Sequence, residues 1–288
     1  MADQKEVLEL KIKAEECRKN VFRMIRAGGH GHVGGALSAI DIVTALYFNE
    51  MNVDPAEPQN PDRDRFILSA GHKCLAQYAV LAEKGYFEKE VLDTYGMLGS
   101  RIPGHPDMHK LNGIEANTGA LGHGISIAAG MAMGAKLEQR QFRVFVVTGD
   151  GELPEGSNWE AAAAAAKFGL DNLIIFVDNN GLQISGKVTD VCNMEPIDRK
   201  FEDFGWAVHT LDGNDMNQIL DALASVPLQK GKPTAFICKT VKAKGMSVGE
   251  NDAAFHFWNA SEELLESTEK EINDRIAVLR QELEELTA

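Results

Sequence analysis

The sequence predicts an α/β fold with a mainly parallel central sheet and helices on both faces. Two observations carry this prediction. Strand-like apolar runs alternate with a helical run in the middle of the chain: FRVFVVT (142–148), NWEAAAAAAKF (158–168) and NLIIFVD (172–178). Two further strand-like runs, near residues 205–211 and 234–239, continue the alternation. Elements in this order form sheets covered on both faces, which bind ligands at the carboxyl ends of their strands.

The chain is expected to begin with two helices joined by a glycine-rich loop. Residues 5–26 have an amphipathic helical pattern, and the following residues lie on or near its apolar face: Leu8, Ile12, Val21, Phe22 and Ile25. The segment AGGHGHVGGALS (27–38) is expected to be the loop. Ser38 would then open the second helix, with Asp41 three residues later as its capping-box partner.

The next segment is expected to contain a strand, two helices and two loops. Residues 53–64 are rich in Pro and Asp and indicate a loop, RFILSAGH (65–72) indicates a short strand and a turn, and residues 74–84 are helical in pattern. Residues 96–124 carry seven glycines, two prolines and three histidines without clear periodicity. Such a long irregular stretch is usually functional. A helix of small residues follows, from about 125 to 137.

The C-terminal residues 261–288 are expected to form a helix appended to a single domain of residues 1–260. Asn259 and Glu262 would cap this helix. Its apolar residues form a stripe on an otherwise acidic surface: Leu265, Ile272, Ile276, Leu279, Leu283 and Leu286. The stripe is expected either to pack on its own domain or to contact a partner.

The composition argues against several classes of function. The net charge of −14 comes without an obvious basic patch, which argues against nucleic-acid binding. No apolar run is long enough to cross a membrane, and the charged N-terminal residues do not resemble a secretory signal, so a cytoplasmic protein is expected. The four cysteines lie far apart and form no CxxC pair, so neither zinc nor a disulfide is expected: Cys17, Cys74, Cys192 and Cys238.

Two loops at expected strand ends carry the first candidate site. Gly149-Asp150-Gly151 follows one strand, and Asp178-Asn179-Asn180-Gly181 ends the next. A glycine turn before a helix exposes backbone N–H groups that suit phosphate. A bare carboxylate repels a pyrophosphate unless a divalent cation bridges the two, so Asp150 predicts a cation, with Asn oxygen and backbone carbonyl as further ligands. A dinucleotide site is the rival, but the glycine spacing differs from G-x-G-x-x-G.

GDG followed at this distance by NN resembles the thiamine-diphosphate-binding motif. The stretch GDGELPEGSNWEAAAAAAKFGLDNLIIFVDNNGLQISG resembles the transketolases in particular. Four more segments match transketolase blocks in the family's order: GHVGGALSAIDIVTALYF, RFILSAGH, GSRIPGHPD and NTGALGHG. The resemblance covers about residues 10–258, and it implies the thiamine-diphosphate-binding fold with thiamine diphosphate and Mg²⁺ or Ca²⁺ as cofactors.

Position by position, the resemblance implies roles for individual residues. The cation would be held by the side chains of Asp150 and Asn180 and the backbone carbonyl of Leu182. The cofactor would be bound by His72, Gly119, Ala120, Leu121, Gly149, Asp150, Gly151, Glu155, Asn180, Lys242 and His256. The catalytic histidines would be His32, His72, His105 and His256. Glu155 and Glu160 match two acids of the subunit-contact region that links paired active sites.

The histidines have alternative interpretations. His30-x-His32 also suggests a metallohydrolase, which would need further His and Asp ligands. However, His32, His72 and His105 each lie in a glycine-containing loop, and imidazoles suit proton transfer to the hydroxyls and carbonyls of sugars. The remaining histidines are expected to be structural: His30, His109 and His209. His123 lies in the cofactor-loop block, where many relatives carry Gln, and is a further candidate for contact with the active site.

The sequence departs from the family pattern in three places. Thr118-Gly119-Ala120-Leu121 is a mild variant of the family's cofactor loop. Val33 stands where Pro is common. The segment AFHFWNAS around His256 lacks the glycine and lysine that usually follow this histidine, which bears on the role of His256 and on acceptor preference.

A complete transketolase is more than twice this length, and its other half carries the pyrimidine-binding domain. The resemblance therefore implies the N-terminal subunit of a split transketolase, active with a separately encoded C-terminal subunit in an α2β2 assembly. It would transfer a two-carbon ketol unit from a ketose phosphate to an aldose phosphate. One alternative is a subunit of a related enzyme for an unusual sugar, dihydroxyacetone synthase-like or 1-deoxyxylulose-phosphate synthase-like. Another is a non-catalytic regulatory subunit, but the retention of Asp150, Asn180 and the four histidines argues against it.

Overall fold

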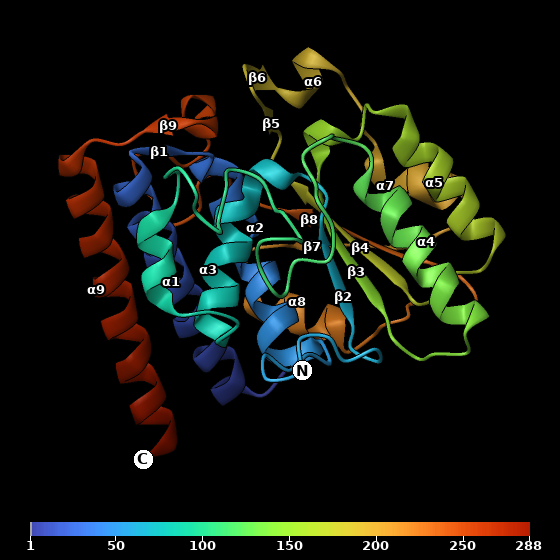
Figure 1. Cartoon of the computed structure of the whole chain (residues 1–288), viewed down its shortest axis with the longest axis horizontal. Helices are drawn as coiled ribbons and strands as arrows, with labels where there is room; N and C mark the ends of the chain where they lie inside the picture. Colours follow the sequence, from blue (N-terminus) through green and yellow to red (C-terminus); the bar gives the residue numbers. More distant parts are fainter. Residues whose placement is uncertain (1) are drawn as a thin grey trace.

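The computed structural model describes residues 2–288, which are built around a five-stranded parallel sheet (Figure 1). The strand order is β2-β3-β4-β8-β7. The strands are β2 (Arg65–Leu68), β3 (Val144–Gly149), β4 (Leu173–Asn179), β7 (Ala207–Asp212) and β8 (Thr234–Lys239). All neighbouring pairs are parallel, so the predicted mainly parallel sheet is confirmed.

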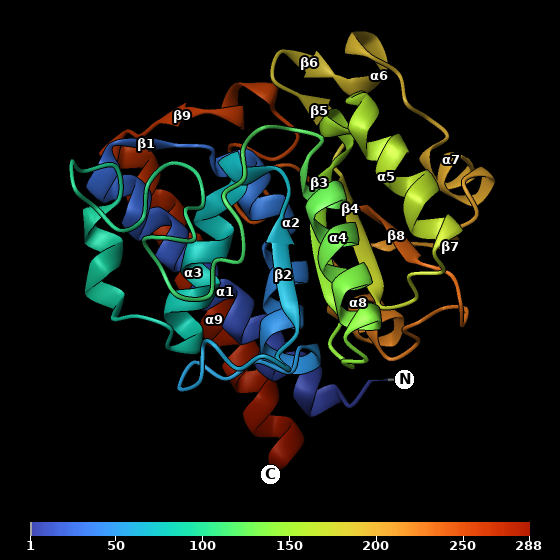
Figure 2. The same cartoon turned by 45° about the vertical axis from the view of Figure 1, so that its right-hand side comes forward.

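Helices cover both faces of the sheet, as predicted (Figure 2). One face is covered by α1 (Gln4–Gly28), α2 (Val33–Ala45), α3 (Cys74–Lys84) and α8 (Met216–Leu223), with α9 (Glu262–Thr287) packed outside α1. The other face is covered by α4 (Gly124–Leu137), α5 (Gly156–Lys167) and α7 (Ile197–Asp203). Because side chains alternate along a strand, Phe145 and Val147 enter the first core, whereas Val144 and Val146 enter the second.

Short elements complete the chain. Two antiparallel ribbons are formed by β1 (His30–Gly31) with β9 (Trp258–Asn259) and by β5 (Leu182–Gln183) with β6 (Gly186–Lys187). The remaining pieces are α6 (Val188–Val191), a π-helical turn Leu46–Glu50, and the 3₁₀ turns Gly71–Lys73, Lys89–Thr94, Asp150–Glu152 and Ala253–His256. Within residues 2–288, no helix combines the length and apolar character that a bilayer span requires.

The predicted start of the second helix is wrong. Helix α2 begins at Val33, inside the glycine-rich segment, and Ser38 lies within it. The glycines permit close helix packing here, because a Cβ on Gly34 would lie 2.7 Å from the Phe255 carbonyl oxygen. The Ser38 hydroxyl therefore does not cap the helix; it donates a hydrogen bond to Asp178 Oδ2 at 2.6 Å.

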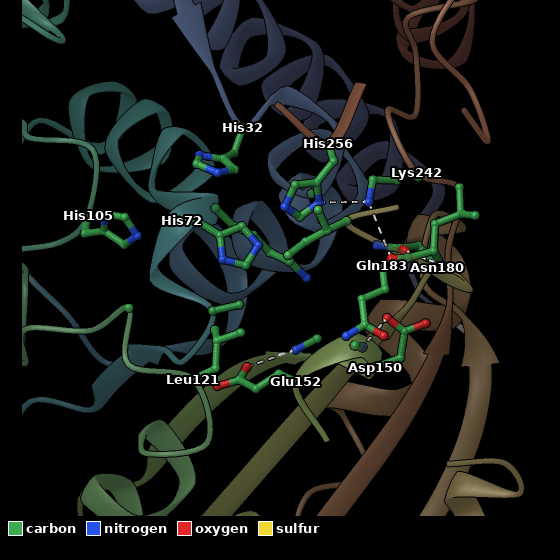
Figure 3. A pocket seen from close by; sticks show the side chains of 18 residues that line it. His32, His72, His105, Leu121, Asp150, Glu152, Asn180, Gln183, Lys242 and His256 are labelled. Carbon is green, nitrogen blue, oxygen red and sulfur yellow. Dashed lines mark hydrogen bonds between the residues drawn. The ribbon is translucent and has the colours of Figure 1, made fainter. Parts of the chain in front are cut away.

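The long segment before α4 is irregular, as predicted from its lack of periodicity. Helix α3 anchors it, since the Tyr78 hydroxyl lies 2.9 Å from the carbonyl of Pro103 and 3.0 Å from that of His105. The Cys74 thiol lies 3.2 Å from the carbonyl of Gly104. These contacts place His105 above the carboxyl end of the sheet (Figure 3).

Helix α9 packs along α1 through the first half of its apolar stripe. Leu265, Ile272 and Ile276 are buried, whereas Leu286 is 50% exposed near the far end of the helix. The cap is Ser261, whose side chain accepts from the N–H of Leu264, and not Asn259 as predicted. The backbone of Asn259 instead pairs with that of His30 in the β1–β9 ribbon.

Candidate active site

A cavity of about 250 Å³ lies at the carboxyl ends of β2, β3 and β4 (Figure 3). It brings together twelve of the predicted site residues: His32, His72, His105, Gly119, Leu121, Gly149, Asp150, Gly151, Asn180, Leu182, Lys242 and His256. Six lining residues were not predicted: Gly35, Ala70, Lys73, Glu152, Gln183 and Ile184. The loops after β2, β3 and β4 meet here because parallel strands place their carboxyl ends at one edge of the sheet.

Asp150 lies at the polar end of the cavity. In the sheet register Gly149 is opposite Asp178, which brings the loops after β3 and β4 together. The Asp150 carboxylate accepts the N–H of Gly151 at 2.8 Å and that of Gly181 at 2.7 Å. Burial raises the pKa of Asp150 to about 6, and the neighbouring Asp178 carboxylate adds to this effect. A bound cation would counteract both effects, because its positive charge stabilises the ionised form of the Asp150 carboxyl.

A buried ion pair orients Asn180. The Asn180 Nδ2 lies 3.3 Å from Asp178 Oδ2, and its Oδ1 accepts the N–H of Leu182 at 3.1 Å. Asp178 is fully buried and also accepts from Lys73 Nζ at 2.6 Å and from the Ser38 hydroxyl at 2.6 Å. Because a carboxylate only accepts hydrogen bonds, Asp178 fixes the Asn180 amide with its nitrogen toward Asp178. The amide oxygen of Asn180 then lies on the side away from Asp178.

Lys242 contributes a second cation beside Lys73. Its Nζ lies 3.1 Å from His256 Nδ1 and donates to the Leu182 carbonyl at 3.4 Å. Burial lowers the pKa of Lys242 to about 8, and the charge of Lys73 adds to this shift. In a chain with a net charge of −14, these two lysines supply the local positive groups that an anionic ligand needs.

Three imidazoles form a cluster above the lysines. The ring centroids of His32, His72 and His256 lie 5.1–5.4 Å apart, and that of His105 lies 6.4 Å from His32 at the exposed mouth. Burial lowers the pKa of His32 and of His256 to about 4, and lowers that of His72 to about 2. These three rings are therefore neutral at pH 7, when each can donate one hydrogen bond and accept another.

Glu152 connects three loops beneath the cavity. Its Oε1 accepts from the Ser69 hydroxyl and from the N–H of Gly122 at 2.8 Å. Its Oε2 accepts from the Thr148 hydroxyl at 2.7 Å and from the N–H of Gly149 at 3.3 Å. Glu152 was not predicted from the sequence, although an acid within a turn between a buried strand and a helix is a signal for such a buried acceptor.

Some predicted residues lie outside this cavity. Ala120 and Glu155 are exposed and do not line it, and Glu160 is exposed on α5. Gly119 lines it with a φ of +131°, a conformation in which a Cβ would lie 2.5 Å from the His105 ring. His123 is exposed and outside the lining, and its Nδ1 lies 3.1 Å from the Leu121 carbonyl oxygen.

The residues of the polar end fit a divalent cation and an attached diphosphate. Asp150, the Asn180 amide oxygen and the Leu182 carbonyl are hard oxygen donors of the kind that Mg²⁺ and Ca²⁺ take. The Gln183 Oε1 atom, on the same wall, is buried without a hydrogen-bond partner. Among residues 2–288, no three His, Cys, Asp or Glu side chains are grouped to hold a metal ion.

Comparison with known proteins places this chain in a family. Residues 11–272 match the family model described as transketolase, thiamine diphosphate binding domain. The chain is 40% identical over 277 residues to an apulose-4-phosphate transketolase subunit of Phocaeicola vulgatus, covering 96% of this chain and 98% of that protein. It is also 40% identical over 265 residues to the 6-deoxy-6-sulfo-D-fructose transketolase subunit of a Clostridium species, covering 92% of this chain and 96% of the relative.

The fold is also that of solved transketolases. The structure of transketolase from Leishmania mexicana matches with a TM-score of 0.85 at 28% identity, covering 100% of this chain and 45% of that one. The chain thus spans less than half the length of this solved transketolase and nearly the whole length of the relatives named as subunits.

Proposed function

The chain belongs to the transketolase family, and from this premise we propose that it is the cofactor-binding subunit of a two-subunit enzyme that transfers a two-carbon ketol unit between sugars. The observation that carries the proposal is the meeting of Asp150, Asn180 and two lysines in one cavity with four histidines. One end of this cavity suits a cation and a diphosphate, and the other suits the hydroxyls and carbonyls of a sugar.

The polar end would hold thiamine diphosphate and its cation, Mg²⁺ or Ca²⁺. Asp150, Asn180 and the carbonyl of Leu182 would bind the cation, and the N–H groups of the Gly149–Gly151 turn would face the diphosphate. Lys242 would supply charge to the diphosphate. When bound, thiamine diphosphate supplies the carbanion chemistry that splits and forms the carbon–carbon bond.

The histidines would bind the sugars and move protons at their oxygens. Neutral imidazoles suit this task because each offers a donor and an acceptor nitrogen. Among the four histidines, His105 lies farthest from Lys242 (Figure 3), and it is exposed, so the sugar would enter on its side. His256 receives its position from the contact with Lys242 Nζ at 3.1 Å.

The sugar would be a ketose that carries an anionic group, and the enzyme would belong to a specialised sugar route. The support is the names of two relatives, one for apulose 4-phosphate and one for 6-deoxy-6-sulfo-D-fructose; each of these sugars carries a phosphate or a sulfonate group. The pentose phosphate pair of the better-known transketolases is the competing substrate, and a panel of ketose donors separates the two.

A cofactor titration tests the proposal. The wild-type chain mixed with its partner subunit should bind thiamine diphosphate, as measured by calorimetry, only when Mg²⁺ or Ca²⁺ is present. Asp150→Ala should lose this cation dependence, with cofactor affinity reduced at least about tenfold, because a charge-assisted contact contributes about 1.5–3 kcal/mol. Asp203→Ala, at an exposed aspartate outside the cavity lining, is the matched control and should bind as wild type. Binding that needs no cation, or that Asp150→Ala leaves unchanged, would contradict the assignment.

A further inference from the structure

Gln183 stands out among the cavity residues because its amide has no partner. The Oε1 atom is buried without a hydrogen bond, although it belongs to a strong acceptor group. Burying such a group unpaired costs free energy, so native proteins pair nearly all of them. Within residues 2–288, only five other side-chain N or O atoms share this state, and none of them belongs to a residue that lines this cavity.

The position of Gln183 is fixed by its neighbours rather than by its own polar atoms. It lies on β5, whose ribbon with β6 pairs Gln183 with Gly186. Its side chain lies flat on Gly151, since a Cβ built there would be 3.2 Å from Gln183 Cγ and 3.5 Å from Cδ. Gly151 thus leaves room for the glutamine, and the glutamine is held over the turn that carries Asp150.

This placement directs the unpaired amide at the polar end of the cavity. Figure 3 shows the Gln183 side chain reaching from the β5 loop toward the Asp150 carboxylate. An amide oxygen and a carboxylate are both acceptors, so a cation or a hydrogen-bond donor is needed between them. The β5 backbone also presents the Leu182 carbonyl, one residue before, to Lys242.

We propose that Gln183 is a binding residue for the cation–diphosphate end of the cofactor. Its Oε1 faces the cation or a water bound to it, and its Nε2 donates to the diphosphate. Two adjacent residues of β5 would then act on the same ligand, Leu182 by its backbone and Gln183 by its side chain. This inference rests on the proposed function, because it assumes that thiamine diphosphate and a divalent cation occupy this cavity.

The test compares Gln183→Leu and Gln183→Glu with the wild-type chain. Gln229→Leu, at an exposed glutamine remote from the cavity lining, is the matched control. Calorimetry measures thiamine diphosphate affinity at saturating Mg²⁺, and the Mg²⁺ concentration for half-maximal binding at fixed cofactor. Gln183→Leu should lower the cofactor affinity about tenfold and raise the required Mg²⁺ concentration about tenfold. This is the size of one hydrogen bond to a charged group. Gln183→Glu keeps the oxygen, so it should need less Mg²⁺ than Gln183→Leu.

Thermal unfolding without cofactor separates binding from a structural role. Because the amide has no partner in the unliganded protein, Gln183→Leu should unfold at the wild-type temperature or higher. If Gln183→Leu binds the cofactor and Mg²⁺ as tightly as the wild type, the assignment of Gln183 is wrong and the proposed function stands. The same conclusion follows if both variants lose equal affinity. A lowered unfolding temperature with unchanged affinity would make it structural. No cofactor binding by the wild-type chain, either alone or mixed with its partner subunit, would overturn the proposed function together with this inference.

Discussion

At the scale of single residues, the half-buried histidines of the cavity link its chemistry to pH. Burial lowers the pKa of His32 and of His256 to about 4, below the ordinary value of 6.5. The unfolded chain therefore binds more protons than the folded chain between about pH 6.5 and pH 4. The sign follows: their contribution to stability is complete above pH 6.5 and falls as the pH drops toward 4.

We expect the double variant His32→Asn/His256→Asn to lose less stability on acidification than the wild type. Urea unfolding at pH 7 and at pH 4.5 measures the difference. Asp150, whose pKa is raised to about 6, acts in the opposite direction in both proteins and cancels in the comparison. His109→Asn, at an exposed loop histidine, serves as the control, and its loss of stability between pH 7 and pH 4.5 should equal that of the wild type. An unchanged pH dependence in the double variant would show that these rings are protonated as freely as in water.

Glu152 is a residue whose importance lies in its four hydrogen bonds. Glu152→Gln replaces one acceptor oxygen by a donor group, so two of the donors beneath the cavity lose their partner. This change should lower the free energy of unfolding by about 1–3 kcal/mol, the cost of leaving buried polar groups unpaired. Glu155→Gln, exposed three residues later, should stay within about 0.5 kcal/mol of wild type. Equal stabilities of the two variants by urea denaturation would contradict the role of Glu152.

At the scale of secondary-structure elements, α9 divides into two halves. The part up to Ile276 packs against α1. Two ion pairs also join the helices: Arg275 Nη2 lies 2.9 Å from Glu15 Oε2, and Arg280 Nη2 lies 3.3 Å from Glu16 Oε1. Ile272 is fully buried, whereas Leu286 is 50% exposed. The apolar stripe of the sequence is therefore partly core and partly surface.

Truncation of the stripe should reveal this division. Ile272→Ala removes buried methyl groups and should lower the free energy of unfolding by about 2–5 kcal/mol. Leu286→Ala should change it by no more than about 0.5 kcal/mol, since its side chain is half exposed already. Chemical denaturation of the two variants provides the comparison. A large loss for Leu286→Ala in the isolated chain would mean that the far end of α9 packs against something in solution.

At the scale of the whole molecule, the parallel sheet explains why one cavity contains residues from most of the sequence. The loops after β2, β3 and β4 open at the same edge, and the segments carrying His32, Lys242 and His256 close the cavity from the opposite side (Figures 1 and 3). The relatives that match over nearly their full length are named as subunits, so activity is proposed to need a second polypeptide.

Mixing experiments address this dependence. The chain alone, with thiamine diphosphate and Mg²⁺, should show little turnover of a ketose–aldose pair, and addition of a pyrimidine-domain subunit from the same organism should restore it. Gel filtration of the mixture should show a complex larger than either polypeptide. Full turnover by the purified chain alone would remove the requirement for a partner.

The sequence by itself determined the fold class, the parallel sheet and the two polar loops after β3 and β4. These features follow from local patterns: apolar runs fix the strands, helical periodicity fixes the helices, and glycines with Asp and Asn mark the strand ends. The same patterns misplaced the start of α2, because the glycines that indicated a loop in fact allow close packing against Phe255. Local propensity does not encode a neighbour that lies far away along the chain.

Only the tertiary structure decided which hydrogen bonds and ion pairs hold the cavity residues in place. Lys73 pairs with Asp178 across 105 residues, and Glu152 accepts from Ser69 across 83 residues. The unpaired amide of Gln183 and the exposure of Glu155 likewise depend on how the β5–β6 ribbon and the start of α5 are placed in space. The physical reason is that hydrogen bonds and burial are properties of atoms brought together by folding, whereas sequence spacing specifies only the elements that carry them.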